Sequence, residues 1–175
     1  MKTPTIETAR LVLRPPTVSD AEIVYKNWTN DTRVTQYMRW NAHNSIDETK
    51  SWLKSAITSE DIESRFDWLI VLKETGEPIG SGGLYYNEKH NMYELGYCVA
   101  YDYWGQGIAT EASQAWLNFA QKTLLQNKFF ACHAQENISS GKVLEKLGFV
   151  YKNDGEYTSF DGLQVFKSRR YFIGE

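Results

Sequence analysis

Apolar and polar positions along the chain form two kinds of pattern, and the first is typical of strands. Runs rich in apolar, aromatic and β-branched residues, each bounded by turn residues, recur along most of the chain. They predict about seven strands, at 10–14, 66–72, 79–86, 92–100, 128–134, 149–157 and 163–172. Tight turns join the second, third and fourth of these strands, which indicates an antiparallel meander.

The second pattern repeats every three to four residues and predicts helices between the first two strands and after the fourth. Ser19 with Glu22, and Ser45 with Glu48, have the spacing of a capping box, which satisfies free N–H groups at a helix start. Asp31 can cap a shorter helix between them. We therefore expect the first third of the chain to be one strand followed by helices at one edge of the sheet.

The strand at 92–100 leads into a helix through a turn that contains two glycines. The turn and the helix start consist of Trp104, Gly105, Gln106, Gly107, Ile108, Ala109 and Thr110. Such a turn points several backbone N–H groups one way, and the helix dipole adds partial positive charge. Glycine, which has no Cβ, also allows a close approach. The stretch therefore predicts a site for a phosphate or pyrophosphate.

Two familiar nucleotide-binding patterns do not fit this turn. The Gly-x-x-x-x-Gly-Lys-Ser/Thr pattern of a P-loop is absent from the chain. The dinucleotide fingerprint needs a third glycine, where Thr110 stands, and an acidic residue further on, where Asn127 and Lys128 stand. From this stretch alone, an ordinary strand–loop–helix connection stays open.

Composition narrows the class of protein. The chain has 175 residues, 42% of them apolar, which fits one globular domain over 1–175. The net charge is −3 and no run of Lys and Arg indicates nucleic-acid binding. Without a signal segment or a long apolar run, we expect a soluble cytoplasmic protein that binds no membrane. Cys98 and Cys132 are predicted to be free thiols, and no spacing indicates a metal site.

Two motifs, in order, carry a resemblance to a known family. The segment from Asn137 through Ser140 to Phe149 contains Asn-x-x-Ser followed by Val-Leu-Glu-Lys-Leu-Gly-Phe, and it follows the Trp-Gly-Gln-Gly-Ile-Ala-Thr-Glu-Ala helix start. With the opening Glu7-Thr-Ala-Arg-Leu-Val-Leu-Arg14, these resemble the RimJ/RimL-type branch of the GNAT superfamily of N-acetyltransferases. Trp104 departs from the Gln or Arg that the family pattern has at that position.

The resemblance implies an α+β fold and a cofactor. The fold would be a mostly antiparallel mixed sheet with helices on both faces and a V-shaped gap between the fourth and fifth predicted strands. The pantetheine arm of acetyl-CoA would lie in this gap, and its pyrophosphate at the glycine turn. The residues implied in coenzyme A binding are Val99, Tyr101, Trp104, Gly105, Gln106, Gly107, Ile108, Ala109, Thr110 and Asn137.

The resemblance also implies roles for two side chains in acetyl transfer. Glu94 aligns with a carboxylate that serves as the base, while Asp67 on a neighbouring strand is a second candidate. Ser140 aligns with a serine that protonates or stabilises the departing thiolate. Many relatives use a tyrosine one turn later, where this chain has Leu144. An exposed strand-end carboxylate for Glu94 and plain helix-start residues for Asn137 and Ser140 stay open.

The function expected from the resemblance is acetyl-CoA-dependent N-acetyl transfer to a primary amine by direct attack on the thioester. The first acceptor is the N-terminal amine of a protein. The alternatives are a small amine such as an antibiotic or polyamine, and a catalytically silent acyl-CoA-binding module on the same fold. A homodimer is left open.

Overall fold

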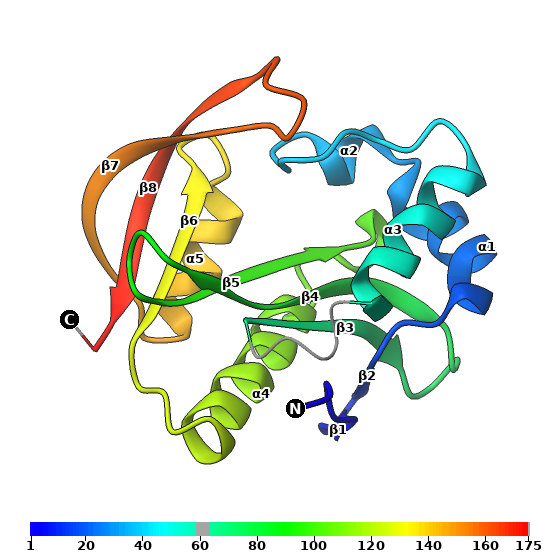
Figure 1. Cartoon of the computed structure of the whole chain (residues 1–175), viewed down its shortest axis with the longest axis horizontal. Coiled ribbons are helices and arrows are strands. Elements are labelled where there is room, and N and C mark those ends of the chain that lie inside the picture. Colours follow the sequence, from blue (N-terminus) through cyan, green and yellow to red (C-terminus); the bar gives the residue numbers. More distant parts are fainter. Residues whose placement is uncertain (59–63, 175) are drawn as a thin grey trace.

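The chain forms one mixed sheet of eight strands, in the order β1-β2-β3-β4-β5-β6-β8-β7 (Figure 1). The computed structural model describes residues 1–58 and 64–174. The strands are β1 (Ile6–Glu7), β2 (Leu11–Arg14), β3 (Arg65–Leu72), β4 (Pro78–Asn87), β5 (Met92–Val99), β6 (Phe129–Ala134), β7 (Val150–Thr158) and β8 (Val165–Ile173). All predicted strands are present, and β1 is an addition that its two residues are too few to predict.

Strands β5 and β6 are the one parallel pair in this sheet, and they pair over only a short length. Their pairing is limited to Tyr93 with Phe129 and Glu94 with Phe130. Beyond these pairs the two strands diverge, which is visible where β6 turns away from β5 in Figure 1. The predicted V-shaped gap therefore lies between β5 and β6, and Glu94 stands where it opens.

Helices cover both faces of the sheet, as predicted. They are α1 (Ala21–Val24), α2 (Thr32–Thr35), α3 (Ile46–Thr58), α4 (Ile108–Thr123) and α5 (Ile138–Lys146). On the face of α4 and α5, Trp68 and Trp116 stack with ring centroids 5.7 Å apart in the main apolar core. On the other face, Trp28 and Val34 from the N-terminal helices pack on Leu69 of β3. No helix within the described ranges is long and apolar enough to cross a membrane.

The start of the N-terminal helical segment differs from the prediction. A 3₁₀ turn (Val18–Asp20) precedes α1, and a π turn (Tyr25–Thr29) follows it. Asp20 closes the first turn, because its carboxylate accepts the Thr17 N–H at 2.8 Å and pairs with Arg14 at 2.6 Å. The predicted capping box of Ser19 and Glu22 is therefore wrong by two positions.

The β7–β8 hairpin reaches across the molecule to the segment 37–41 that follows α2 (Figure 1). The Tyr157 hydroxyl donates to the Tyr37 carbonyl at 2.7 Å, and the Phe160 N–H donates to the Arg39 carbonyl at 2.7 Å. The Asn41 amide donates to Asp161 at 2.6 Å. These contacts place the hairpin end and the segment 37–41 side by side, on the side of the sheet that carries α1 to α3.

Candidate functional site

The open side of β5 presents backbone groups to the gap. The Ala100 N–H donates to the Ile79 carbonyl at 2.8 Å. Hydrogen-bonded and non-hydrogen-bonded pairs alternate along an antiparallel ladder, so the groups of Val99, and of Tyr97 two residues earlier, point away from β4. The Val99 carbonyl already accepts the Trp104 indole N–H at 2.7 Å. An extended arm in the gap can therefore pair with Tyr97 and with the Val99 N–H.

Tyr101, one of the residues that the resemblance implied in coenzyme A binding, lies beyond the strand. It begins a 3₁₀ turn (Tyr101–Tyr103), and its carbonyl accepts the Trp104 N–H at 3.1 Å. The two aromatic rings lie 4.9 Å apart, and 48% of Trp104 is exposed. Tyr101 therefore borders the glycine turn, and Tyr97 takes the gap-facing position that sequence reasoning missed.

The glycine turn has the backbone that an anion site requires. Gly105 and Gly107 have positive φ angles of 73° and 76°, and Gly107 is the N-cap of α4. A Cβ on Gly105 would meet nothing within 4 Å, so the turn is open on that side. Ile108 is buried and holds the helix in the core, while the N–H groups of Ile108, Ala109 and Thr110 have no carbonyl four residues earlier within the helix. The turn therefore fits a phosphate group.

An ion-pair network ties the N-terminal strands to this turn. Glu111 on the first turn of α4 accepts hydrogen bonds from the Thr8 hydroxyl at 2.6 Å and from the Arg10 Nε at 2.7 Å. Arg10 Nη1 also donates to the Gln106 carbonyl at 2.9 Å. Partial burial raises the pKa of Glu111, but these hydrogen bonds outweigh it and hold the pKa below its ordinary value. Gln106 is thus held in place by a positively charged side chain beside the turn.

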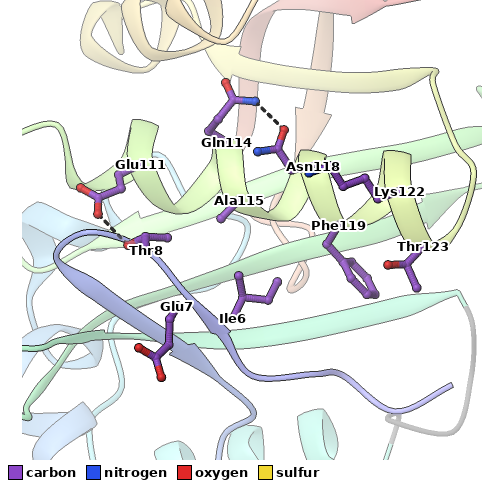
Figure 2. Close-up of a pocket in the computed structure, with 10 residues that line it drawn as sticks. All are labelled: Ile6, Glu7, Thr8, Glu111, Gln114, Ala115, Asn118, Phe119, Lys122 and Thr123. Atoms are coloured by element: carbon purple, nitrogen blue, oxygen red, sulfur yellow. Dashed lines mark hydrogen bonds between the residues drawn. The ribbon is translucent and has the colours of Figure 1, made fainter.

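Figure 2 shows Thr8 and Glu111 joined at one end of a groove between β1 and α4. The groove has a volume of about 530 Å³ and contains neither Glu94 nor Ser140. Sequence reasoning gave Arg10 and Glu111 no role, although each lies inside a segment that carried the family resemblance. A role for these residues follows only from their pairing, and the pairing joins residues about a hundred positions apart that only the fold brings together.

Glu94 lies in the gap with two polar neighbours. Its Oε2 accepts a hydrogen bond from the Asn87 amide at 2.8 Å, and the Cys132 Sγ lies 3.9 Å from its Oε1. The side chain is half-buried on the sheet face that carries α1 to α3. It faces no guanidinium partner in an ion pair within the described residues. The carboxylate is therefore held in position by hydrogen bonds and not by an ion pair.

Asp67, the second candidate base, is committed to a structural role. It is only 7% exposed and pairs with Arg65 at 2.5 Å. It also accepts the Tyr85 hydroxyl at 3.1 Å, and burial raises the pKa of that tyrosine well above its ordinary value. Asp67 is thus buried in an ion pair, whereas Glu94 is half-buried with no ion-pair partner among the described residues, so the geometry favours Glu94.

The other side of the gap is the start of α5. Asn137 caps this helix, because its Oδ1 accepts the Ser140 N–H at 3.3 Å and the Ser139 hydroxyl at 2.9 Å. The Tyr97 hydroxyl crosses the gap from β5 and donates to the Ser140 carbonyl at 3.4 Å. Burial raises the pKa of Tyr97 to about 12, so its hydroxyl keeps its proton at neutral pH. Leu144, one turn after Ser140, is buried in the core.

The structure thus places Glu94 at the last pair of β5 with β6, the Ser140 carbonyl across from Tyr97, and the glycine turn beyond the end of β5. It adds the Tyr97 hydroxyl, which sequence reasoning missed although Tyr97 closes the Glu94-Leu-Gly-Tyr97 stretch. The available signal was the alternation of the strand, which places Tyr97 on the α5 face and Glu94 on the opposite face.

Comparison with known families and proteins gives a consistent result. A family model described as "Acetyltransferase (GNAT) domain" matches residues 10–150. The uncharacterized N-acetyltransferase p20 of Bacillus licheniformis is 31% identical over 148 residues, which covers 83% of this chain and 82% of p20.

Two solved structures share the fold at low sequence identity. The ribosomal-protein-S5-alanine acetyltransferase of Vibrio fischeri superposes with a TM-score of 0.81 at 19% identity and covers 98% of this chain and 97% of its own. The microcin C7 self-immunity acetyltransferase MccE, solved in complex with acetyl-CoA and AMP, has a TM-score of 0.80 at 17% identity. That match covers 94% of this chain and 92% of the MccE chain.

Proposed function

The chain belongs to the GNAT family of acetyltransferases, which use acetyl-CoA, and we propose that it acetylates a protein N-terminal amine in the manner of the RimJ/RimL branch. The observation that carries this proposal is the position of Glu94. Its carboxylate stands where β5 and β6 part, in the same gap that ends at the glycine turn. A base and an anion site at one gap are what amine acetylation from a coenzyme A thioester requires.

The residues at the gap fit acetyl-CoA. The turn 104–110 would hold its pyrophosphate, with Arg10 adding positive charge nearby, since its Nη2 lies 3.6 Å from where a Gly107 Cβ would be. Backbone groups of Tyr97 and Val99, and the helix start at Asn137, would hold the arm. When bound, acetyl-CoA supplies an acetyl thioester with a thiolate leaving group.

Different side chains of the protein accept and donate the protons of the reaction. Glu94 accepts the proton that the acceptor ammonium must lose before its nitrogen can attack. On the α5 side, the hydroxyls of Ser140 and Tyr97 carry protons beside the start of the helix, where negative charge on the departing sulfur is stabilised. The nitrogen thus loses one proton to Glu94 before attack and a second as the amide forms. The sulfur gains one proton on the Ser140 side, so that one proton in total is released to solvent.

The acceptor amine is assigned from the resemblance and from the chemistry of Glu94. An N-terminal amine has a pKa of about 8, so a single carboxylate is sufficient to deprotonate it, whereas a lysine at about 10.4 needs more help. The assignment to the RimJ/RimL branch rests on the segment 7–14 and the two motifs of α4 and α5.

A small-molecule amine is the second candidate, and one observation favours it. The β7–β8 hairpin contacts the segment 37–41 through Tyr157, Phe160 and Asp161, so that side of the Glu94 face is closed by protein. A closed acceptor side suits a compact amine better than a protein segment.

The experiment that tests the function is a thiol-release assay with acetyl-CoA and a panel of amines. The panel contains short peptides with free N-termini, their N-formylated counterparts, amino acid amides and polyamines. We expect release with free N-termini and none with the blocked peptides. Release with small amines alone would favour the second candidate, and tight acetyl-CoA binding without release for any amine would leave a silent binding module.

A further inference from the structure

Two arginines border Glu94 on the acceptor side, and their surroundings indicate what the acceptor carries. Cys132 of β6, whose Sγ lies 3.9 Å from Glu94 Oε1, is the register partner of Arg170 on β8. Directly paired residues of a ladder project from the same face of a sheet. Arg170 therefore lies on the face of Glu94, one strand beyond Cys132.

Arg170 has room on that face because β7 has a glycine beside it. A Cβ built on Gly155 would lie 2.2 Å from Arg170 Nε and 2.5 Å from its Nη2. The guanidinium thus lies over Gly155 of β7, in space that a side chain at 155 would fill. A guanidinium presents several N–H donors that match a carboxylate or a phosphate.

Arg39 approaches the same point from the segment 37–41. Its guanidinium carbon lies 5.2 Å from the centre of the Tyr157 ring, and its positive charge acts to lower the pKa of the Cys132 thiol, against the larger effect of burial. The carbonyl of Arg39 accepts the Phe160 N–H at 2.7 Å, which holds its backbone to the hairpin. Arg39 comes from the segment 37–41 and Arg170 from β8 of the hairpin, and both lie near Cys132.

Neither guanidinium has a carboxylate partner in an ion pair among residues 1–58 and 64–174. The ion pairs of Arg10, Arg14, Arg33 and Arg65 all lie elsewhere, and none of those within the described residues involves Arg39 or Arg170. The nearby Glu94 is bonded to Asn87 and approached by Cys132 instead. Two half-buried guanidinium groups and one carboxylate leave a local excess of positive charge in a protein whose net charge is −3.

We propose that the acceptor carries an anionic group, a carboxylate or a phosphate, next to its amine, and that Arg39 and Arg170 bind this group. The inference rests on the proposed acetyl transfer and names the acceptor class for that site. With the anion on the two arginines, the amine nitrogen falls on the Glu94 side of the cluster. A polyamine, which brings only positive charge, is disfavoured by the same two groups.

The test compares acceptors that differ in one charge but keep the same kind of amine. The carboxylate pair is aspartic acid α-amide and asparagine amide, and the phosphate pair is O-phosphoserine amide and serine amide. A third pair consists of peptides that begin with Asp or with Asn, which separates an acidic protein N-terminus from a small molecule. Each kcat/KM is corrected for the fraction of neutral amine at the assay pH.

The parent enzyme is expected to prefer the anionic member of at least one pair by about 10- to 100-fold, the range of one or two charge-assisted hydrogen bonds. Arg39→Gln and Arg170→Gln should each remove most of this preference, because KM should rise more for the anionic acceptor than for its neutral partner. Arg39→Lys, which keeps the charge, should retain part of it. Arg169→Gln is the matched control, because it removes one charge from the opposite face of the same strand.

The possible outcomes distinguish a failure of this inference from a failure of the proposed acetyl transfer. Thiol release that is equal for charged and neutral acceptors in the parent overturns the inference and leaves acetyl transfer standing. A preference that persists in both glutamine variants also overturns it. Absence of thiol release with every amine overturns the proposed function instead. Calorimetric binding of the N-acetylated aspartic acid α-amide to the parent and to Arg39→Lys provides a second readout should a glutamine variant fail to fold.

Discussion

Two ionisable groups stand 3.9 Å apart in the gap, Glu94 and Cys132, and their environments give them different chemistry. Burial, and then the neighbouring Glu94 charge, raise the pKa of the Cys132 thiol to about 11. The thiol therefore stays protonated near neutral pH and is a poor nucleophile. A covalent acetyl-cysteine route is disfavoured by this geometry, and direct attack by the amine is favoured.

The role of Glu94 can be tested with a substitution that keeps its shape. Glu94→Gln should lower kcat/KM at neutral pH, and the deficit should shrink as pH approaches the pKa of the amine, because solvent then deprotonates the acceptor. The loss should be larger for a lysine-like amine near pKa 10.4 than for an N-terminal amine near 8. A pH series of both enzymes on two acceptors measures this. A variant that only raises KM, at every pH alike, would instead make Glu94 a binding residue.

The two hydroxyls on the α5 side can be separated by mutation. Ser140→Ala should lower kcat by roughly 10- to 1000-fold with little change in KM for acetyl-CoA, because the hydroxyl acts as charge develops on sulfur. Tyr97→Phe removes the second hydroxyl, which lies 3.4 Å from the Ser140 carbonyl. Single-turnover rates of the two variants assign the donor. Unchanged single-turnover rates in both would leave the proton to solvent.

At the scale of single residues, the sequence predicts the positions of residues that lie within short motifs. Glu94, Gly107 and Ser140 lie within short motifs, so their placement at strand and helix ends follows from the neighbouring residues. Tyr97 and Arg39 were missed because their positions depend on the strand register and on the docking of the hairpin. These are contacts between residues far apart in the chain, which periodicity does not reveal.

At the scale of elements, the glycine turn before α4 is the best-defined part of the site, and a matched pair of glycines tests it. Gly107→Asp should weaken coenzyme A binding by at least 10-fold, because it places a carboxylate at a phosphate site. Gly76→Asp is the control, since Gly76 has a similar φ of 72° in a remote turn and open space around it. Calorimetric titration with coenzyme A compares the two. Equal weakening in both variants, or none in Gly107→Asp, would place the cofactor elsewhere.

A buried histidine where α5 packs on β6 predicts that the stability of the protein depends on pH. His133 lies under this helix, with its Nε2 only 2.9 Å from where a Cβ of Gly141 would be. Burial lowers the pKa of His133, and burial likewise lowers the pKa of His43 near α3. The unfolded chain therefore binds protons first as pH falls through about 6.5, and the free energy of unfolding should decrease from pH 7.5 to pH 5.5.

Urea unfolding across that range, for the parent and for His133→Asn and His43→Asn, measures the effect. The pKa of Asp20 and of Glu111 is already lowered in the folded protein, so these carboxylates act below this window. The parent's loss of stability on acidification should be smaller in each variant. A parent whose stability is constant over the window would contradict the burial of neutral histidines.

At the scale of the whole molecule, the pattern of apolar and polar residues predicted neither the order of the strands nor the gap. Periodicity predicted the strands and most helices, but the gap between β5 and β6 came only from the family resemblance, and their parallel pairing was not predicted. The strand β1 was missed because two residues carry no periodicity. The Thr8–Glu111 and Tyr157–Tyr37 contacts join segments more than a hundred residues apart, and local signals contain nothing of either.

In the proposed function, coenzyme A and the acceptor bind on different sides of one gap. The glycine turn and α5 lie on the side of the main core, while Glu94, Cys132 and the hairpin contacts lie on the other. On this proposal both substrates can be bound at once, with Glu94 on the acceptor side. The central claim is that acetyl passes directly from one to the other in this ternary complex.

Initial rates measured over a grid of acetyl-CoA and acceptor concentrations test this claim most directly. The account predicts double-reciprocal lines that intersect, and no acetyl group on the protein by mass spectrometry after incubation with acetyl-CoA alone. Parallel lines together with a stoichiometric acetyl group on Cys132 would contradict it, because the acetyl group would then pass through the enzyme.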